Sequence, residues 1–246
     1  MITNRIAALF VLFALLFSSC ITDYDGGGSF FGQGIKGEGP VTSKALELNG
    51  FTKISLGTPG EVFLSQGEAY SFRVEAQQNI IDNLETKING EELEIGFDKS
   101  VRSYESLKFY ITMPTLEEVN LAGSGDVAGE TPFSGLGNFE ANIAGAGNVS
   151  LSLEARAVSL SIAGSGDIEL DGTAESVEVN IMGSGSVRAE SLSTPTADIN
   201  IAGSGDCAID ATKKLDVSIA GSGDVYYLGS PEISKSIAGS GSVKKK

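Results

Sequence analysis

A short glycine-rich sequence recurs seven times in the second half of the chain, and its spacing limits the folds that the chain can adopt. The commonest form of this repeat is IAGSGD followed by an apolar residue, and the copies begin at residues 121, 143, 162, 181, 201, 219 and 237. Their first glycines are 22, 19, 19, 20, 18 and 18 residues apart. A repeat of about 20 residues is typical of solenoids, in which each unit buries its apolar residues only against neighbouring units.

Apolar and polar residues alternate on both sides of each glycine turn. Val177, Val179 and Ile181 precede the fourth turn, and Cys207 and Ile209 follow the fifth. A period of two residues indicates β-strands with one buried face, so Cys207 is expected to face inward. The sequence therefore predicts an all-β, single-stranded parallel β-helix whose Gly-Ser-Gly turns stack rung on rung. The usual crossover rule favours a right-handed helix, and a left-handed helix is the alternative because rungs of 18 residues also suit it.

Two glycines in each copy are the predicted corner residues. Sharp corners often require a positive φ, which glycine adopts without strain. Small neighbours also allow one turn to stack on the next at the strand spacing of about 4.8 Å. The predicted structural turns contain Gly123, Gly125, Gly145, Gly147, Gly164, Gly166, Gly183, Gly185, Gly203, Gly205, Gly221, Gly223, Gly239 and Gly241.

The residue after each second glycine is an aspartate in four of the seven copies. Calcium-binding β-rolls also combine glycine with aspartate, but they repeat every nine residues and order these residues differently. An aspartate column without metal would repel itself, and Asn148, Ser186 and Ser242 interrupt this column. We therefore expect the aspartates to cap turns, and we expect neither a metal nor a cofactor.

Charge and composition exclude several classes of activity. The chain has no histidine, which excludes His-dependent triads and His-ligated zinc or haem. Its 17 basic and 32 acidic side chains give a net charge of −15, which argues against a nucleic-acid partner. Glu178 and Asp198 are conceivable as a glycosidase pair, but no spacing distinguishes them from other acids on outer strand faces. No catalytic residue is predicted.

The N-terminal segment has the features of a targeting sequence. Arg5 precedes an apolar run at 6–17, which is too short to span a bilayer but suits a signal peptide. Ser18-Ser19-Cys20 resembles a bacterial lipobox, although Phe17 stands where leucine is usual, and ordinary secretory cleavage is the alternative. We predict a lipoprotein signal peptide at 1–19, a lipidated Cys20 with a flexible linker at 20–34, and a β-helical domain at 35–246.

Residues 37–113 are less repetitive but also rich in β-strand patterns. Asn-Gly after Ile88 predicts a hairpin turn, and residues 77–84 are expected to form one short helical turn. We expect this part to begin the same solenoid and to cap its N-terminal end.

Several segments together resemble the head GIN domain family, whose members are described as auto-transporter adhesins and are common among Bacteroidetes lipoproteins. The resemblance extends from about residue 35 to the end of the sequence. It implies a β-helical, extracytoplasmic and non-enzymatic protein, and it carries no catalytic motif. The segments are GEGPV at 38–42, FTKISLGTPGEVFLSQG at 51–67, FRVEAQQNIID at 72–82, LEIGF at 93–97 and YITMPTLEEVNLAGSGDV at 110–127.

Two classes of function follow from these features. The first is a lipid-anchored cell-envelope protein with an adhesive, binding or structural role. Its partners would be a membrane, through the lipid on Cys20, and a surface glycan or protein ligand. Such a protein is expected in the outer membrane, periplasmic or surface-exposed. The alternative is a polysaccharide-active lyase or glycosidase, which the fold also permits but which the scattered arginines do not favour.

Lysines are also placed at the last predicted rung. Lys235 occupies a position that is apolar in other rungs, and Lys244, Lys245 and Lys246 follow the seventh turn. Charge at an open strand edge opposes the addition of further strands. We therefore expect these lysines to limit end-to-end association.

Overall fold

The computed structural model describes residues 34–246. The predicted signal peptide at 1–19, Cys20 and nearly all of the predicted linker lie outside the described residues. Within the described part, the chain is nearly all β, with one short helix, α2 (Gln78–Ile81). None of the helices in this part is long and apolar enough to span a membrane.

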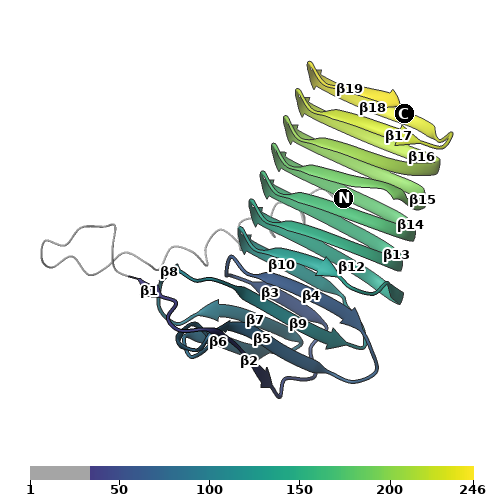
Figure 1. The fold of residues 1–246 in the computed structure, drawn as a ribbon. Helices are drawn as coiled ribbons and strands as arrows, with labels where there is room; N and C mark the ends of the chain where they lie inside the picture. Colours follow the sequence, from purple (N-terminus) through teal and green to yellow (C-terminus); the bar gives the residue numbers. More distant parts are fainter. Residues whose placement is uncertain (1–33) are drawn as a thin grey trace, which may run out of the picture. The chain divides into compact units, whose positions relative to one another are not determined.

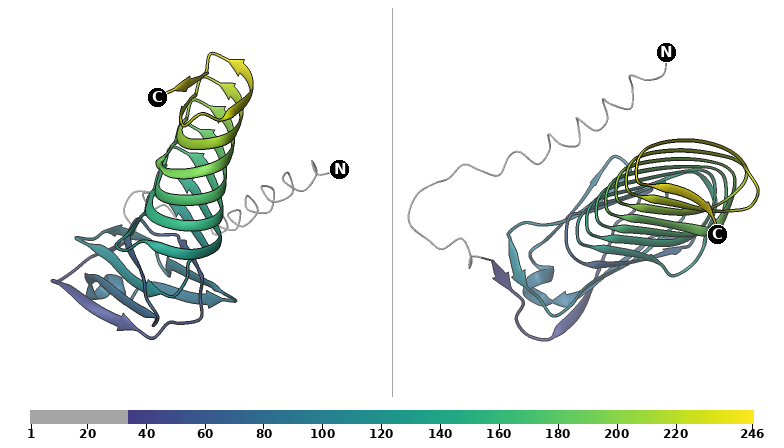
Figure 2. Two further views of the ribbon diagram at one scale, coloured as in Figure 1. Left: turned by 90° about the vertical axis from the view of Figure 1, so that its right-hand side faces the viewer. Right: turned by 90° about the horizontal axis from the view of Figure 1, so that it is seen from above.

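The second half of the chain is a parallel β-solenoid, as the repeat predicted. Each long strand forms most of one rung and pairs in parallel with the next strand in sequence (Figure 1). Figure 2 shows these rungs wound into one coil. The preference for a right hand stays a prediction from the crossover rule. The strands are β12 (Phe133–Gly145), β13 (Asn148–Gly164), β14 (Asp167–Gly183), β15 (Ser186–Gly203), β16 (Asp206–Gly221), β17 (Asp224–Leu228), β18 (Glu232–Gly239) and β19 (Ser242–Lys245).

Equivalent residues stack in register, so that each rung covers the core of the one before it. Leu160 lies beside Val179, and Val179 lies beside Ile199. All three are buried without exposure to solvent. Cys207 is equally buried between Val187 and Val225, which confirms its inward position. The core is therefore one apolar column along the solenoid axis, and polar side chains alternate with it on the outer faces.

The two corner glycines of each turn are required for different reasons. Gly164 has φ +144°, and a Cβ on it would overlap the carbonyl oxygen of Gly145 in the preceding rung. Gly166 does not have a positive φ, but its Cβ would overlap the carbonyl oxygen of Gly147. Backbone hydrogen bonds cause this close approach: Ser165 N–H donates to the Gly145 oxygen over 2.8 Å. The second glycine is thus required because the rungs stack closely, and not because the backbone angle is unusual.

The first half of the described chain begins the same solenoid. Strands β3 (Lys53–Leu56) and β4 (Glu61–Gln66) pair in parallel with β10 (Glu118–Gly123) and β11 (Asp126–Gly129). On their other edges they pair in parallel with β7 (Glu92–Phe97) and β9 (Leu107–Met113). Three further rungs are thus built from separate short strands: β10 with β11, β3 with β4, and β7 with β9.

The N-terminal end is closed by antiparallel strands, in the part of the chain that was expected to cap the solenoid. β5 (Ser71–Gln77) lies antiparallel between β9 and β2 (Val41–Leu46). β6 (Leu84–Asn89) forms the predicted hairpin with β7, and Gly90 in its turn has φ +63°. A short parallel pair, β1 (Ile35–Lys36) with β8 (Val101–Ser103), completes the region.

Candidate functional site

A polar groove of about 820 Å³ runs across the rungs on one face of the solenoid. Residues of β3, β10, β12, β13, β14, β15 and β16 line it. Most of its lining consists of two adjacent columns on the outward face of these strands, and each column contains residues that occupy equivalent positions in successive strands. The predicted turn glycines do not line it, and its chemistry therefore comes from residues outside the glycine repeat.

One of these columns, the acid column, carries mostly carboxylates. Successive members are register partners, so their Cα atoms lie about 4.8 Å apart. Their side chains point outward because the residues between them face the core. The acid column consists of Glu118, Glu140, Ser159, Glu178, Asp198 and Asp216.

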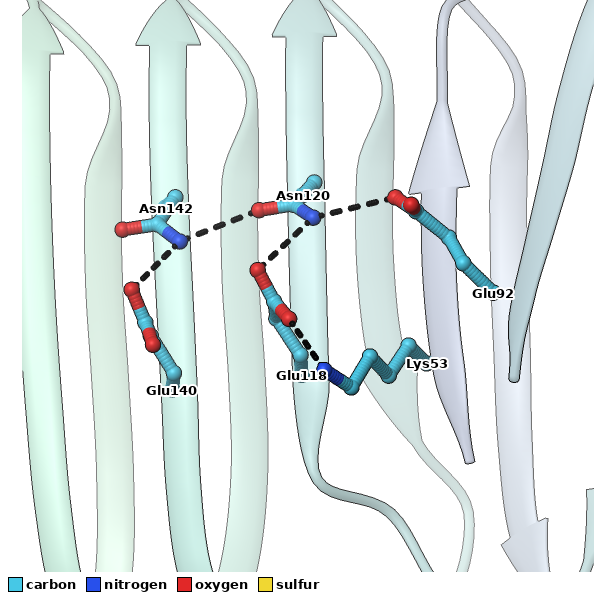
Figure 3. Close-up of polar contacts among 6 residues, drawn as sticks. All are labelled: Lys53, Glu92, Glu118, Asn120, Glu140 and Asn142. Carbon is cyan, nitrogen blue, oxygen red and sulfur yellow. Dashed lines mark hydrogen bonds and ion pairs between the residues drawn. The ribbon is translucent and has the colours of Figure 1, made fainter. Parts of the chain in front are cut away.

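An adjacent amide column holds these carboxylates in place. In four strands, an asparagine two residues further on donates a hydrogen bond from Nδ2 to the carboxylate of the acid column, over 2.9–3.1 Å. Asn142 also donates to Oδ1 of Asn120 over 3.0 Å, and Asn120 donates to Glu92 (Figure 3). The carboxylates of these four strands thus have a fixed orientation. The four pairs are Asn120 with Glu118, Asn142 with Glu140, Asn180 with Glu178 and Asn200 with Asp198.

The second column, the mixed column, lies beside the acid column on the same outward face, two residues earlier in each strand. Apart from Ala157 it carries hydroxyl, amide and basic side chains. It consists of Asn138, Ala157, Ser176, Thr196 and Lys214, which are again register partners. Three basic side chains lie along the groove. Lys53 Nζ lies 3.3 Å from Glu118, Lys214 pairs with Asp216, and Arg156 donates to Asn138 over 3.1 Å. The groove is therefore acidic but carries positive charge at both ends and in its middle.

In the middle of the acid column, carboxylates of successive strands lie next to one another and repel each other. Partial burial raises the pKa of Asp198, and the neighbouring carboxylates of Glu178 and Asp216 raise it further. The hydrogen bond from Asn200 and the charge of Lys214 act in the opposite direction without cancelling this shift. An acid whose pKa is raised by folding is less stable in its ionised form in the fold than in the unfolded chain.

Asp198→Asn should therefore stabilise the protein at neutral pH. The new amide keeps the Oδ1 acceptor for Asn200 and removes the repulsion from Glu178 and Asp216. Because Asp198 is half exposed, we expect the melting temperature at pH 7 to rise by only about 1–3 °C. The gain should disappear as the pH falls through the pKa of Asp198, since the parent then carries a neutral acid. Thermal unfolding at about pH 7 and about pH 3 measures this; an equal gain at both would contradict the argument.

Glu178 and Asp198 are not arranged as the catalytic pair of a glycosidase. They are register partners in the same column, and Ser176 and Thr196 lie beside them in the mixed column. Glycosidases place two carboxyl groups on either side of the scissile bond. Two parallel carboxylates in one column would instead contact the same side of a bound chain.

The aspartates after the glycine turns have a structural role. Asp126 Oδ1 accepts the backbone N–H of Asn148 over 3.1 Å, and Asp206 Oδ1 accepts that of Asp224 over 2.8 Å. The predicted capping thus occurs, but it joins one rung to the next and does not close the residue's own turn. Among residues 34–246, no group of three or more His, Cys, Asp or Glu side chains is placed to hold a metal ion.

Taken together, the fold and the groove define a parallel β-solenoid with an extended polar face. A family model described as "Putative auto-transporter adhesin, head GIN domain" matches residues 50–231. The chain therefore belongs to the head GIN domain family, as the sequence resemblance indicated.

Solved structures of similar proteins cover 87% of this chain and 100% of their own. One is titled a putative adhesin from Bacteroides fragilis, with 28% identity and a TM-score of 0.82. Another is titled a putative lipid binding protein from Parabacteroides distasonis, with 30% identity and a TM-score of 0.72. A putative adhesin from Parabacteroides merdae, with 21% identity and a TM-score of 0.70, shares the fold. The search of curated proteins gave no match.

Sequence reasoning missed the groove although a signal for it was present. An acidic residue, an apolar residue and an asparagine precede the glycine turn in four rungs, for example Glu178-Val179-Asn180 and Asp198-Ile199-Asn200. The recurrence of this triplet at the rung spacing predicts two polar columns on one outer face. The mixed column carries no such signal, because its members differ in every rung.

Proposed function

We propose that this protein is a lipid-anchored, non-enzymatic binding protein of the cell envelope, with an adhesive role, held in the outer membrane by a lipid on Cys20. The observation that carries the proposal is the groove itself, which presents similar polar groups at successive rungs. Such a surface suits an extended partner that contacts several rungs at once, with many weak contacts acting together. Membership of an adhesin family and the adhesin names of similar structures support this role.

The groove does not favour lipid as the bound partner. Its walls carry carboxylates, amides, hydroxyls and basic side chains, while the apolar residues of the same strands face the core and are buried. An acyl chain in this groove would lie against charged groups and would separate them from water. The lipid-binding name of the Parabacteroides distasonis protein is therefore not the function that we propose for this chain.

The alternative of a polysaccharide-active enzyme is also less well supported. Its acids lie side by side in one column, and of the described arginines only Arg156 lines the groove. Arg73, Arg102 and Arg188 do not line it, so they are not placed to assist a reaction there. Binding without bond cleavage is the activity that this arrangement favours.

The anchoring part of the proposal predicts a change of location. Cys20→Ala removes the thiol that would carry the lipid, so the protein should leave the membrane fraction or remain unprocessed. Fractionation of cells, with the mass of the mature protein, measures both. Cys207→Ala is the control, because that cysteine is buried in the core and should not affect location. Unchanged fractionation and mass in Cys20→Ala would contradict lipidation.

The binding part of the proposal predicts retention on glycoprotein- and glycan-rich surfaces. Labelled protein is applied to immobilised cell envelopes and to immobilised mucin, and the retained fraction is measured. Ser176→Trp places a large side chain in the groove and should reduce retention at least about tenfold, which corresponds to about 1.4 kcal/mol. Ser150→Trp is the matched control, because Ser150 is an exposed strand serine outside the groove. Equal retention of the two variants, or no retention of the parent protein on either surface, would reject the proposal.

A further inference from the structure

We infer that the groove binds a linear polysaccharide without acidic sugars; this inference rests on the proposed binding function and specifies its ligand. The first reason is the repetition of the groove. The acid and mixed columns present a pair of polar groups in β12, β14, β15 and β16, and the rungs lie about 4.8 Å apart along the axis; in β13 the mixed column carries Ala157. A polymer of repeating polar units can meet such a surface with the same kind of contact several times, whereas a compact ligand would use only one or two rungs.

The second reason is the way the carboxylates are held. Glu140, Glu178 and Asp198 each accept a hydrogen bond from an asparagine on the side away from the mixed column. Each carboxylate has two oxygens, so acceptor capacity remains for a ligand. Fixed orientation contributes more to directional hydrogen bonds, such as those from sugar hydroxyls, than to charge attraction.

The third reason is the chemistry of the neighbouring mixed column. Ser176 and Thr196 carry hydroxyl groups, and Asn138 carries an amide, so this column both donates and accepts. Sugar hydroxyls also donate and accept. At the centre of the groove a polysaccharide lying along both columns would therefore meet acceptors from one column and hydroxyls from the other.

The charge of the groove selects against other polymers. Six carboxylates and three basic side chains line it, so an acidic polysaccharide would be repelled. A basic peptide would meet Lys53, Arg156 and Lys214, of which Lys53 and Lys214 already pair with the acids at the two ends. An uncharged chain avoids both conflicts.

Calorimetric titration of the full chain with soluble polymers tests the inference. The probes are three neutral polysaccharides, dextran, mannan and laminarin, with polygalacturonate and poly-L-lysine as charged comparisons. We expect at least one neutral polysaccharide to bind, with an affinity that changes less than about twofold between low and high salt, because screening weakens mainly charge attraction. Failure of all three neutral polymers to bind, or binding of poly-L-lysine alone, would overturn the inference.

Variants test whether the neutral polysaccharide binds in the groove. Glu178→Ala with Asp198→Ala should weaken the binding of the neutral polymer at least about tenfold. Glu178→Gln with Asp198→Asn should weaken it less, because the amide oxygens still accept hydrogen bonds. The matched control is Glu169→Ala with Asp171→Ala, which removes two exposed acids of β14 outside the groove and should have no effect. Equal affinity of the groove and control variants would overturn the inference, and thermal unfolding verifies that each variant folds.

The two proposals fail separately. If Ser176→Trp abolishes retention on envelopes or mucin while no neutral polysaccharide binds, the binding function stands and the glycan ligand is wrong. If the parent protein is retained on neither surface, the proposed function itself is wrong. Periodate oxidation of the immobilised surfaces adds a direct distinction, because it destroys glycans and should remove retention only if the ligand is a glycan.

Discussion

Gly164→Ala is expected to lower the free energy of unfolding by more than about 4 kcal/mol, or to prevent folding. Gly164 combines a positive φ with the closest possible stacking of one turn on the next. An alanine there would be strained by its backbone angle. Its Cβ would also overlap the Gly145 carbonyl oxygen, which accepts hydrogen bonds from Ser165 and Gly166. The rungs could relieve the overlap only by separating, which breaks the parallel ladder.

Three other glycines separate these two causes. Gly123 has φ +119° but no atom near the position of a Cβ, so Gly123→Ala should cost only about 1–2 kcal/mol. Gly166 has the overlap without the positive φ, so Gly166→Ala should cost about 2–4 kcal/mol. Gly137 has neither feature, and Gly137→Ala should be neutral or slightly stabilising.

Equilibrium unfolding in denaturant measures the series. The expected order of stability is Gly137→Ala, Gly123→Ala, Gly166→Ala and Gly164→Ala, from the most to the least stable. A Gly166→Ala variant as stable as Gly137→Ala would show that the rungs can separate at little cost. The stacking argument would then be wrong.

Lys235→Val is expected to convert the protein into larger species as its concentration rises. Within the described residues, β18 pairs with β16 only, so its other edge is open. Ile233 and Ile237 are each 37% exposed there, although their partners Leu215 and Ile219 are buried. Lys235 lies between them, above the buried Val217. Removing its charge would leave an uninterrupted apolar strip on an open strand edge, which favours strand addition between molecules.

Lys213→Val is the matched control, since Lys213 is an exposed lysine on β16 away from the open edge. Light scattering over a range of concentrations should show a constant mass for the parent and the control, and a rising mass for Lys235→Val. A monomeric Lys235→Val protein would contradict the prediction. A parent protein that is already associated through this edge would contradict it as well.

Two of the other terminal lysines form ion pairs with earlier rungs, in addition to the role expected from the sequence. Lys244 Nζ lies 3.2 Å from Asp224, and Lys246 Nζ lies 2.8 Å from Glu190. Ser242 and Lys244 lower the pKa of Asp224 to about 2, which keeps its carboxylate ionised well below neutral pH. These lysines therefore join the last rung to earlier rungs, and their replacement should loosen that rung. Lys235 is the lysine best placed to limit association.

The rung, its corners and its buried face were predictable from the sequence because each depends on local, repeated constraints. Alternation with period two identifies the inward residues without reference to the rest of the chain. Corner glycines such as Gly123 and Gly164 recur because every rung turns in the same way. The hairpin at Asn89-Gly90 is equally local, since two residues and their backbone angles determine it. These features led to the fold class and to the inward position of Cys207.

The functional groove was decided by tertiary structure, because it depends on which residues of different rungs lie side by side. Insertions change the length of the rungs, and the structure absorbs them outside the glycine turns, for example in the register shift of β15 against β16 between Ala189 and Ser193. Only the resulting register aligns Ser176 with Thr196 and Lys214 in one column. The antiparallel cap is also non-local: β5 pairs with β2 and β9, which lie far from each other in sequence. Local periodicity specifies how each residue faces, whereas contacts between distant strands specify its neighbours, and the chemistry of the groove depends on those neighbours.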